Sequence, residues 1–325
     1  MGALEITLIV LGAILLLGIV LNMRKDRSDG TFVRDVPAYR TMLGYIMPTR
    51  NESIVYFDDY VNAEPLLDYL AQAKQKFTCD VTQCLVASTA LAIVDNPKMN
   101  QFVLGHRLYR RKDGYISFSA KRRRGDSRAK LTAVKYKIDP EQTFREFCAW
   151  VDGKLNVAVS DKVLPEDKEL GFYTKLPRPI LKRAVGFVRW LDYHNILPSS
   201  FIEHDAFYTS VFVANLGSVG MAPGYHHLYE WGTAPLFVMA GKIEDRPVVV
   251  DGEVVVRKML HLRYSYDERV DDGLTSGYGI RSVKHVLEHP FLYFGGLADD
   301  GSDSTKFGDL PSAHKTDVHK QERDR

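Results

Sequence analysis

The densest group of ionisable side chains is the segment 267–273, which reads Asp-Glu-Arg-Val-Asp-Asp-Gly. It follows the run 253–266, in which apolar and polar side chains alternate with Lys258 as the one exception. Such alternation predicts a β-strand with one buried face and one polar face. Turns that follow strands often display functional groups, and carboxylates there can accept or donate protons. A solvated turn that caps the next helix is the alternative.

Two other segments contain groups suited to chemistry. An Asn-Leu-Gly sequence begins at Asn215, after the strand-like run 208–213, and His226 and His227 follow in the loop beyond it. An imidazole titrates near neutral pH and can move a proton in catalysis. A packed or surface histidine is the alternative for each of the two. The cysteines lack the spacing of a metal site or a disulfide framework, so we expect no metal and a reducing compartment.

The elements that position these segments form a mixed pattern. Strands are predicted over residues 102–109, 115–120, 133–138, 208–213, 236–243 and 253–266. Helices are predicted over residues 63–77, 82–94, 139–155 and 276–288. This order of elements predicts an α+β fold in which helices pack on a mostly antiparallel sheet.

The composition is that of a globular protein. Of 325 residues, 45% are hydrophobic and 11% aromatic, which is enough for a sizeable core. The net charge of +2 gives no support to a nucleic-acid partner. No internal repeat appears, so we expect one folded domain over residues 31–297. A charged linker over residues 24–30 precedes it, and a polar, disordered tail over residues 298–325 follows.

The first segment has a different composition. Residues 8–21 form an unbroken apolar run, and the span 3–23 has three polar interruptions. A helix of that length reaches about 30 Å, the thickness of a bilayer core. The sequence therefore predicts a single-pass anchor in the lipid bilayer of the cell membrane. A signal peptide is the alternative, which Glu5 ahead of the run disfavours. Basic residues at positions 24, 25 and 27 predict that the domain faces the cytoplasm.

Three segments occur in a fixed order and spacing, namely residues 215–220, 242–252 and 267–273. Together they resemble the catalytic domain of the dihydrolipoyl acyltransferases of 2-oxo acid dehydrogenase complexes, which are relatives of chloramphenicol acetyltransferase. Residues 96–100 are similar to the family's Pro-x-x-Asn segment. The resemblance spans most of residues 45–292 and is strongest after Phe207. It implies a chloramphenicol acetyltransferase-like mixed sheet with flanking helices, and a homotrimer whose active sites lie in channels between subunits.

The resemblance also exposes two departures. The family motif is Asp-His-Arg-x-x-Asp-Gly, and its histidine removes the proton from a thiol or hydroxyl acceptor; Glu268 stands at that position. A carboxyl group has a reference pKa of about 4.3, whereas a thiol has a pKa of about 8.5, so the carboxylate is a weak base toward the thiol. We therefore expect Glu268 to act as a base only in a dry site that raises the pKa of its carboxyl group. The family's Ser or Thr, which steadies the oxyanion, is replaced by Ala214. A base contributes about 10²–10⁴-fold in rate and an oxyanion donor about 10²–10³-fold.

Other roles are implied by the same resemblance. Asp272 would be the structural acid of the motif and pair with Arg50. The loop with His226 and His227 would lie close to the substrate channel, where either histidine could replace the missing base, whereas His261 lies on the opposite face of its strand. Structural roles are implied for four further motif residues: Arg269, Gly273, Asn215 and Gly217.

A basic cluster, Arg122, Arg123 and Arg124, follows a predicted strand. Guanidinium groups bind phosphates well, so we expect this cluster to bind coenzyme A or acyl-coenzyme A, or the anionic inner leaflet of the membrane. A solvated loop is the alternative.

Two hypotheses of function follow. The first is a membrane-anchored, coenzyme A-dependent acyltransferase-like trimer with Glu268 at the base position. The second is a catalytically inactive trimeric scaffold or binding protein, a pseudoenzyme, at the membrane. The missing hydroxyl at Ala214 favours the second hypothesis.

Overall fold

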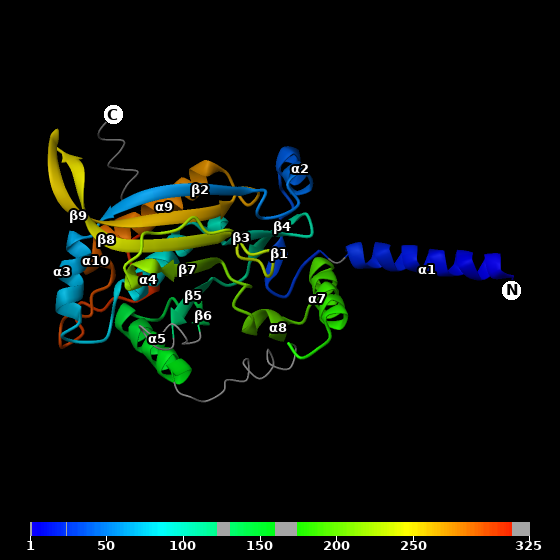
Figure 1. The fold of residues 1–325 in the computed structure, drawn as a ribbon, viewed down its shortest axis with the longest axis horizontal. Coiled ribbons are helices and arrows are strands. Elements are labelled where there is room, and N and C mark those ends of the chain that lie inside the picture. The colour runs from blue at the N-terminus through cyan, green and yellow to red at the C-terminus, as the bar shows by residue number, and fades with distance from the viewer. Residues whose placement is uncertain (1, 24, 122–130, 160–173, 314–325) are drawn as a thin grey trace.

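The computed structural model describes residues 2–23, 25–121, 131–159 and 174–313. Its main sheet has the strand order β2-β9-β8-β7-β5-β6 (Figure 1). The β5–β7 and β7–β8 pairs are parallel and the other pairs are antiparallel, so the sheet is mixed. The strands are β2 (Ile54–Asn62), β5 (Tyr115–Lys121), β6 (Leu131–Lys137), β7 (Val211–Asn215), β8 (Leu236–Val250) and β9 (Glu253–Asp267).

A smaller sheet has the order β1-β4-β3. Its strands are β1 (Gly30–Phe32), β3 (Gln101–Leu104) and β4 (Arg107–Arg111). The predicted single strand over residues 102–109 is wrong, because Gly105 and His106 have φ angles of 55° and 61°. Left-handed residues of this kind reverse the chain in a tight turn, so β3 and β4 form a hairpin.

The described helices are α1 (Ala3–Met23), α2 (Ala38–Ile46), α3 (Glu64–Ala73), α4 (Val81–Asp95), α5 (Phe144–Val159), α7 (Arg178–Tyr193), α8 (Ser199–His204), α9 (Gly273–Glu288) and α10 (Pro290–Tyr293). Short 3₁₀ helices lie at Pro97–Asn100, Leu216–Val219 and Phe307–Asp309. The start of α4 is a capping box, in which Asp80 accepts from the Thr82 amide and Gln83 accepts from the Asp80 amide. α4 is apolar on all sides, as expected of a helix buried in the core.

The two faces of the main sheet are covered differently. On one face, α3, α4, α5 and α9 enclose the main core, which includes Val213, Val238 and Leu262 from the strands. On the other face, Phe212 and Phe237 belong to a smaller cluster with Leu228 from the loop that follows β7. One face is therefore closed by helices, while the other is closed by a loop.

The prediction of a linker at residues 24–30 is wrong for its described part. The Arg27 side chain is 1% exposed and forms ion pairs with Asp29 and Asp192 at 2.9 and 2.8 Å. Gly30 already belongs to β1. Because Arg27 is buried in ion pairs, it is not a basic residue that flanks α1 in solvent.

The prediction of a disordered tail is wrong for residues 298–313. Phe307 is packed in the main core, and Ala313 is fully buried. The Ala313 amide donates to Asp95 at 2.8 Å. Single apolar residues in a polar stretch can fix a chain to a body that is already folded. Residues 314–325 lie outside the described residues.

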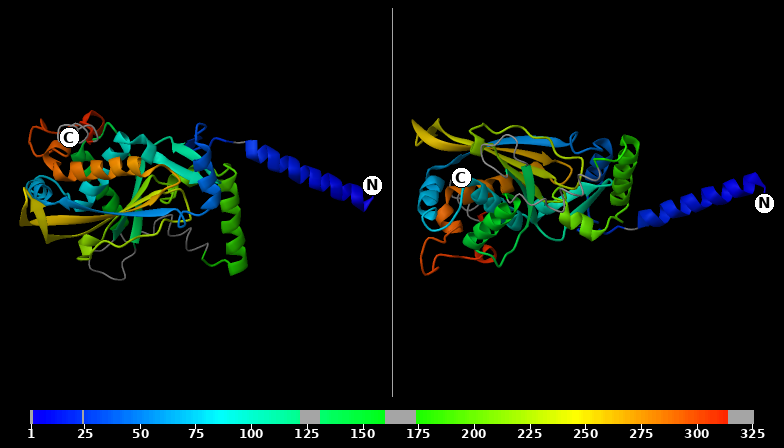
Figure 2. Two further views of the ribbon diagram at one scale, coloured as in Figure 1. Left: turned by 90° about the horizontal axis from the view of Figure 1, so that it is seen from above. Right: turned by 60° about the horizontal axis from the view of Figure 1, so that its bottom comes forward.

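α1 projects away from the body of the molecule (Figure 2). Its span Leu4–Met23 has a mean hydropathy of 2.8, and none of it is buried. By length and composition this helix is able to cross a membrane. A signal sequence near an N-terminus has the same properties.

Candidate functional site

The turn after β9 is built around one buried ion pair. Asp267 is fully buried, and its two oxygens accept from Nε and Nη2 of Arg269 at 2.9 and 2.8 Å. Asp267 also accepts from the Ser53 hydroxyl at 2.9 Å. Arg269 donates a further bond to the carbonyl of Met47 at 2.8 Å, just after α2. Arg269 thus joins the turn to α2 and neutralises the buried Asp267.

Glu268 does not lie on the buried face of the strand. Its side chain is exposed in the single chain, while Tyr266 and Val270 occupy the inward positions. Its amide donates to the carbonyl of Ser53 at 3.0 Å, which fixes the backbone of the turn. The expected dry site is therefore not formed by this chain alone.

The expected Asp272–Arg50 pair is absent from the described contacts. Asp272 is exposed and caps α9, where it accepts from the Thr275 amide at 3.0 Å. That hydrogen bond lowers the pKa of Asp272. Arg50 is buried and donates to the carbonyls of Tyr229 and Gly232 at 3.0 and 2.8 Å. The helix cap is satisfied locally, which explains why the carboxylate does not reach the buried arginine.

A second buried acid of the turn was not identified from the sequence. Asp271 is 7% exposed and lies 3.7 Å from Arg40 and 3.9 Å from Lys98. Lys98 belongs to the Pro-x-x-Asn segment, so this segment contacts the turn. Asp271 is the first of two adjacent aspartates, and periodicity alone does not indicate which of the two is buried.

The Asn-Leu-Gly segment joins the end of β7, at Asn215, to the 3₁₀ helix Leu216–Val219. Asn215 accepts from the Ser218 amide at 3.2 Å and donates to the Thr82 hydroxyl at 3.1 Å, which joins it to α4. Gly217 approaches the backbone of β8 closely, because an added Cβ would lie 2.3 Å from the Gly241 carbonyl oxygen. A cavity of about 200 Å³ lies beside these residues.

Gly217→Ala is expected to lower the free energy of unfolding by about 1–3 kcal/mol, the usual cost of overpacking. The reason is that the clash is with backbone, which cannot rotate away. Gly273→Ala is the matched control, since an added Cβ there meets nothing within 4 Å. Urea denaturation of the two variants in detergent measures the difference. Equal stability of both would contradict the close approach at Gly217.

The two motifs lie at different levels along the sheet, beyond opposite ends of the short strand β7. Asn215 pairs with Ala240, which pairs with Leu262, so Leu262 lies level with Asn215 across the sheet. Glu268 is six residues further along the chain. At about 3.3–3.4 Å per strand residue, this places Glu268 about 20 Å from the level of Asn215. The single chain therefore does not bring the two motifs into one site.

His226 and His227 lie in the loop on the outer face of the sheet. His226 stacks on Phe237 with ring centroids 4.0 Å apart, and its carbonyl accepts from the Ser265 hydroxyl. Burial lowers the pKa of His226, which favours the neutral imidazole. His227 is exposed. Ser265 lies three residues before Glu268, so the loop runs beside the last part of β9.

A polar cluster on the same face was not identified from the sequence. Asp58 of β2 accepts from His261 and Arg263 of β9, both at 2.7 Å, and from the Tyr225 hydroxyl. Burial would raise the pKa of Asp58, but the hydrogen bonds from Tyr225, Arg263 and His261 lower it to about 2. The polar face of residues 253–266 indicated His261 and Arg263. Asp58 could not be placed beside them, because strand β2 was not predicted.

The expected phosphate-binding residues Arg122, Arg123 and Arg124 lie outside the described residues.

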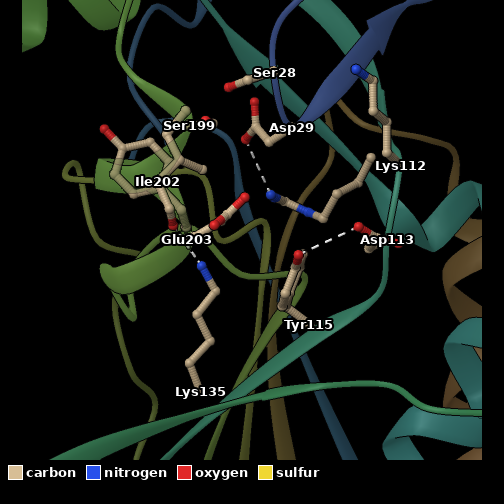
Figure 3. Close-up of a pocket in the computed structure, with 11 residues that line it drawn as sticks. Ser28, Asp29, Lys112, Asp113, Tyr115, Lys135, Ser199, Ile202 and Glu203 are labelled. Atoms are coloured by element: carbon tan, nitrogen blue, oxygen red, sulfur yellow. Dashed lines mark hydrogen bonds and ion pairs between the residues drawn. The ribbon is translucent and has the colours of Figure 1, made fainter.

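Figure 3 shows a pocket of about 60 Å³ between the ends of β4–β6 and α8. Lys135 closes it by donating to the carbonyls of Ile202 and Asp205 at 2.7 and 3.1 Å. Burial, with repulsion from Arg111, lowers the pKa of Lys135 to about 8. Small-molecule sites usually measure about 300–1,000 Å³. This pocket is too small for a thioester, and its lysine has a structural role.

The chain is similar to known acyltransferases in sequence. Residues 203–294 match the family model of the 2-oxoacid dehydrogenases acyltransferase (catalytic domain). A segment of 57 residues is 44% identical to the lipoamide acyltransferase component of the branched-chain alpha-keto acid dehydrogenase complex of Pseudomonas putida. Another of 47 residues is 47% identical to the dihydrolipoyllysine-residue succinyltransferase component of the 2-oxoglutarate dehydrogenase complex of Cupriavidus necator. These matches cover 18% and 14% of this chain, but only 14% and 11% of those proteins.

The fold is similar to a solved structure over most of the chain. It matches a probable dihydrolipoamide acetyltransferase from Listeria monocytogenes with a TM-score of 0.52 and 17% identity, covering 79% of this chain and 94% of that one. The predicted α+β fold with a mixed sheet of this type is confirmed. The predicted family resemblance is confirmed for residues 203–294.

Proposed function

We propose that this chain is a membrane-anchored acyltransferase-fold protein that binds a coenzyme A thioester between the subunits of a homotrimer. The match over residues 203–294 and the shared fold support the acyltransferase type. The apolar, unburied helix α1 supports anchoring in the cell membrane. In this proposal α1 spans the bilayer and the body faces the cytoplasm.

The separation of the two motifs is the observation on which the proposal rests. Glu268 and Asn215 lie about 20 Å apart along the sheet, too far to act on the same carbonyl carbon. Both motifs are nevertheless at the surface, since Glu268 and Ser218 are exposed. A neighbouring copy that brings its Asn215 end to this chain's Glu268 end completes the site and covers Glu268.

The chemistry would be transfer of an acyl group from coenzyme A to a thiol or hydroxyl acceptor. The Glu268 carboxylate takes the acceptor proton as the acceptor attacks the thioester carbonyl. A tetrahedral intermediate forms, the carbon–sulfur bond breaks, and the coenzyme A thiolate takes the proton back from Glu268. Arg122, Arg123 and Arg124 would hold the phosphates of coenzyme A in this proposal.

A trimeric scaffold without catalysis is the second candidate. Ala214 favours it, because its methyl group packs against the Phe212–Phe237 cluster and offers no hydroxyl to an oxyanion. This candidate keeps the assembly and the ligand site but not the transfer step.

A cysteine pair tests the shared site. The native cysteines Cys79, Cys84 and Cys148 are buried, so Glu268→Cys and Ser218→Cys introduce the reactive thiols. We expect a short bismaleimide to link different copies of the double variant, and mass photometry in detergent to give a trimer. Each single variant, and Glu268→Cys combined with Lys76→Cys on another surface, should link far less. A monomer, or equal linking in the control pair, would contradict the shared site.

A further inference from the structure

Helix α7 exposes apolar side chains next to basic ones. Ile180, Phe187 and Trp190 are 52%, 59% and 42% exposed, and with Arg183 they form one stripe at spacings of three and four residues. Such spacing places the four side chains on one side of a helix. This stripe, Ile180, Arg183, Phe187 and Trp190, is called the outer stripe of α7 below.

The rest of α7 explains why the outer stripe stays uncovered. The helix packs on the body through Val188 and Leu191, which contact the cluster of Leu197, Ile202 and Tyr208. Lys182 and Arg189 are also exposed on α7. Asp192, the acid near the end of α7, is buried against Arg27. The exposed surface of α7 is therefore both apolar and basic.

α7 lies at the end of the body from which α1 projects. In the three views of Figures 1 and 2, α7 runs across the direction of α1. If α1 is normal to a bilayer, α7 is parallel to its surface. The side of α7 that faces away from the body then faces that surface.

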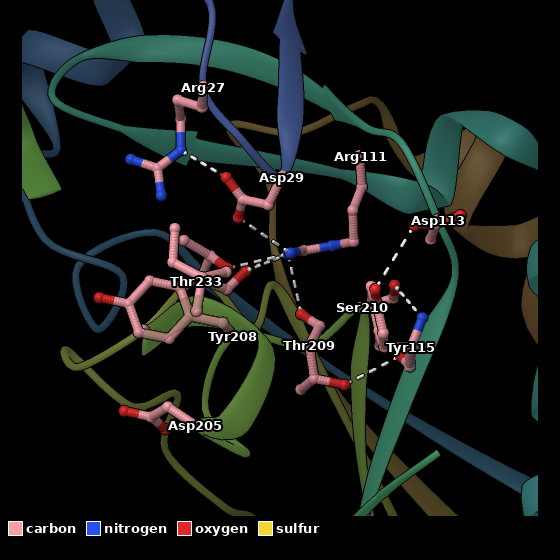
Figure 4. A network of polar contacts seen from close by, with 12 residues as sticks. Arg27, Asp29, Arg111, Asp113, Tyr115, Asp205, Tyr208, Thr209, Ser210 and Thr233 are labelled. Carbon is pink, nitrogen blue, oxygen red and sulfur yellow. Dashed lines mark hydrogen bonds and ion pairs between the residues drawn. The ribbon is translucent and has the colours of Figure 1, made fainter. Parts of the chain in front are cut away.

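Two sets of contacts hold α1 and α7 in this relation. Arg27, four residues after the end of α1, donates to the Asp192 carboxylate and to the Asp192 carbonyl at 2.8 and 3.0 Å. Asp29 joins Arg27 to Arg111, which donates to the Thr233 carbonyl (Figure 4). Arg107 of β4 donates to the carbonyl of Asn22 at 2.9 Å, at the end of α1. The contacts of Arg27 with Asp192 are buried, and the contact of Arg107 with the end of α1 is exposed.

α2 extends the same surface. It exposes Tyr39, Met42, Tyr45 and Ile46 at 62%, 54%, 60% and 68%. Tyr45 stacks on His106 at 4.6 Å between ring centroids, and His106 contacts Tyr193 of α7 at 6.2 Å. Exposed apolar side chains of α2 and α7 are thus joined by a row of rings.

We propose that α7, with α2 beside it, lies on the surface of an anionic bilayer, so that the body is held flat against the membrane rather than hanging from α1. Helices with Lys and Arg beside exposed Phe and Trp lie in the bilayer interface, and Trp and Tyr favour that depth. Each basic residue near an anionic surface adds to the attraction. The proposal rests on the membrane anchoring proposed for α1. It also places the Glu268 turn near the bilayer, because Arg269 donates a hydrogen bond to the carbonyl of Met47, just after α2.

Quenching of Trp190 by brominated lipid tests the surface contact. The full chain is reconstituted into vesicles of phosphatidylcholine and phosphatidylserine in which bromines lie near the headgroup end of the acyl chains. We expect the Trp190 emission to be blue-shifted and to be quenched by the bromines. This emission is the difference between the spectra of the wild type and of Trp190→Phe. The double variant Trp150→Phe with Trp231→Phe, in which Trp190 is the remaining tryptophan, gives the same signal directly.

The variant Phe187→Glu should lose the blue shift and the quenching of Trp190. Val254→Glu is the matched control, because Val254 is 71% exposed in the β8–β9 hairpin at the far end of the body; it should change neither. Vesicles of phosphatidylcholine alone should give weaker quenching, and unchanged quenching there would overturn the anionic contact.

Resistance of the chain to carbonate extraction reports on α1 separately. If the chain is extracted while Trp190 is still quenched, anchoring by α1 fails and the surface contact stands. If Trp190 is blue-shifted in detergent and never quenched, a second copy covers the outer stripe and the proposal is overturned. A red-shifted, unquenched Trp190 overturns it as well.

Discussion

Asp267→Ala is expected to lower the free energy of unfolding by about 3–5 kcal/mol, the usual cost of removing one partner of a buried ion pair. Arg269 would stay in the interior with its charge uncompensated, since Asp267 is its carboxylate partner. Arg50 is also buried, and burial lowers its pKa, while the negative charge of Asp267 raises it. Without Asp267, the charged form of Arg50 would be less stable. Urea denaturation of the full chain in detergent measures the loss.

Two variants separate the ion pair from the rest of the turn. Asp267→Ala with Arg269→Met should recover much of the stability, because replacing both members of a buried pair by apolar groups is often neutral. Glu268→Ala should change the free energy of unfolding by less than about 0.5 kcal/mol, as is usual at an exposed position. If Asp267→Ala is as stable as Glu268→Ala, the pair does not hold the turn.

The elements with strong periodicity could be predicted from the sequence. β9 follows the alternation of residues 253–266, with Leu260, Leu262 and Tyr264 buried as expected. Val256 on the same face is 69% exposed, because it lies in the part of the β8–β9 hairpin that extends beyond the core. α4 and α9 are near their predicted positions for a similar reason, since caps and apolar spacing mark their ends. These signals are local, so they do not depend on the rest of the fold.

Elements whose burial depends on distant partners could not be predicted. β2 contains Asp58 and Asp59, which are unfavourable in strands and are satisfied by His261, Arg263 and Lys284 from other elements. β8 continues seven residues past its predicted end because β9 pairs with it. The burial of Arg27 likewise depends on Asp192, which is far away in the sequence.

The motif could be predicted, but its geometry could not. The sequence indicated which residues belong to the turn, yet Glu268 is exposed and Asp272 caps α9 instead of pairing with Arg50. Backbone amides at a helix start are always available to a carboxylate nearby, and this local partner prevails over a distant arginine. The completion of the site by another copy, which we propose above, stays a prediction that the family resemblance implies and that periodicity within one chain does not describe.

Restoring the family pattern with Glu268→His and Ala214→Ser is expected to raise acyl transfer by about 10²-fold or more over the wild type, which we expect to show little or none. The imidazole supplies a base worth about 10²–10⁴-fold, and the hydroxyl supplies an oxyanion donor worth about 10²–10³-fold. The two effects are not additive, because they act in the same step. Transfer from acetyl-coenzyme A to dihydrolipoamide by the reconstituted chain measures the gain.

The single variants and Glu268→Gln distinguish the two functions. Each single variant should gain less than the double variant. All of them should remain trimers, because each substitution changes one side chain at the edge of the proposed contact between copies and leaves the rest of that contact unchanged. A trimeric double variant without activity would show that the channel no longer admits the ligands, which favours the scaffold. Robust transfer by the wild type that Glu268→Gln abolishes would instead establish Glu268 as a working base. A neighbouring copy would then have to exclude water from that carboxylate, because an exposed carboxylate is a weak base toward a thiol.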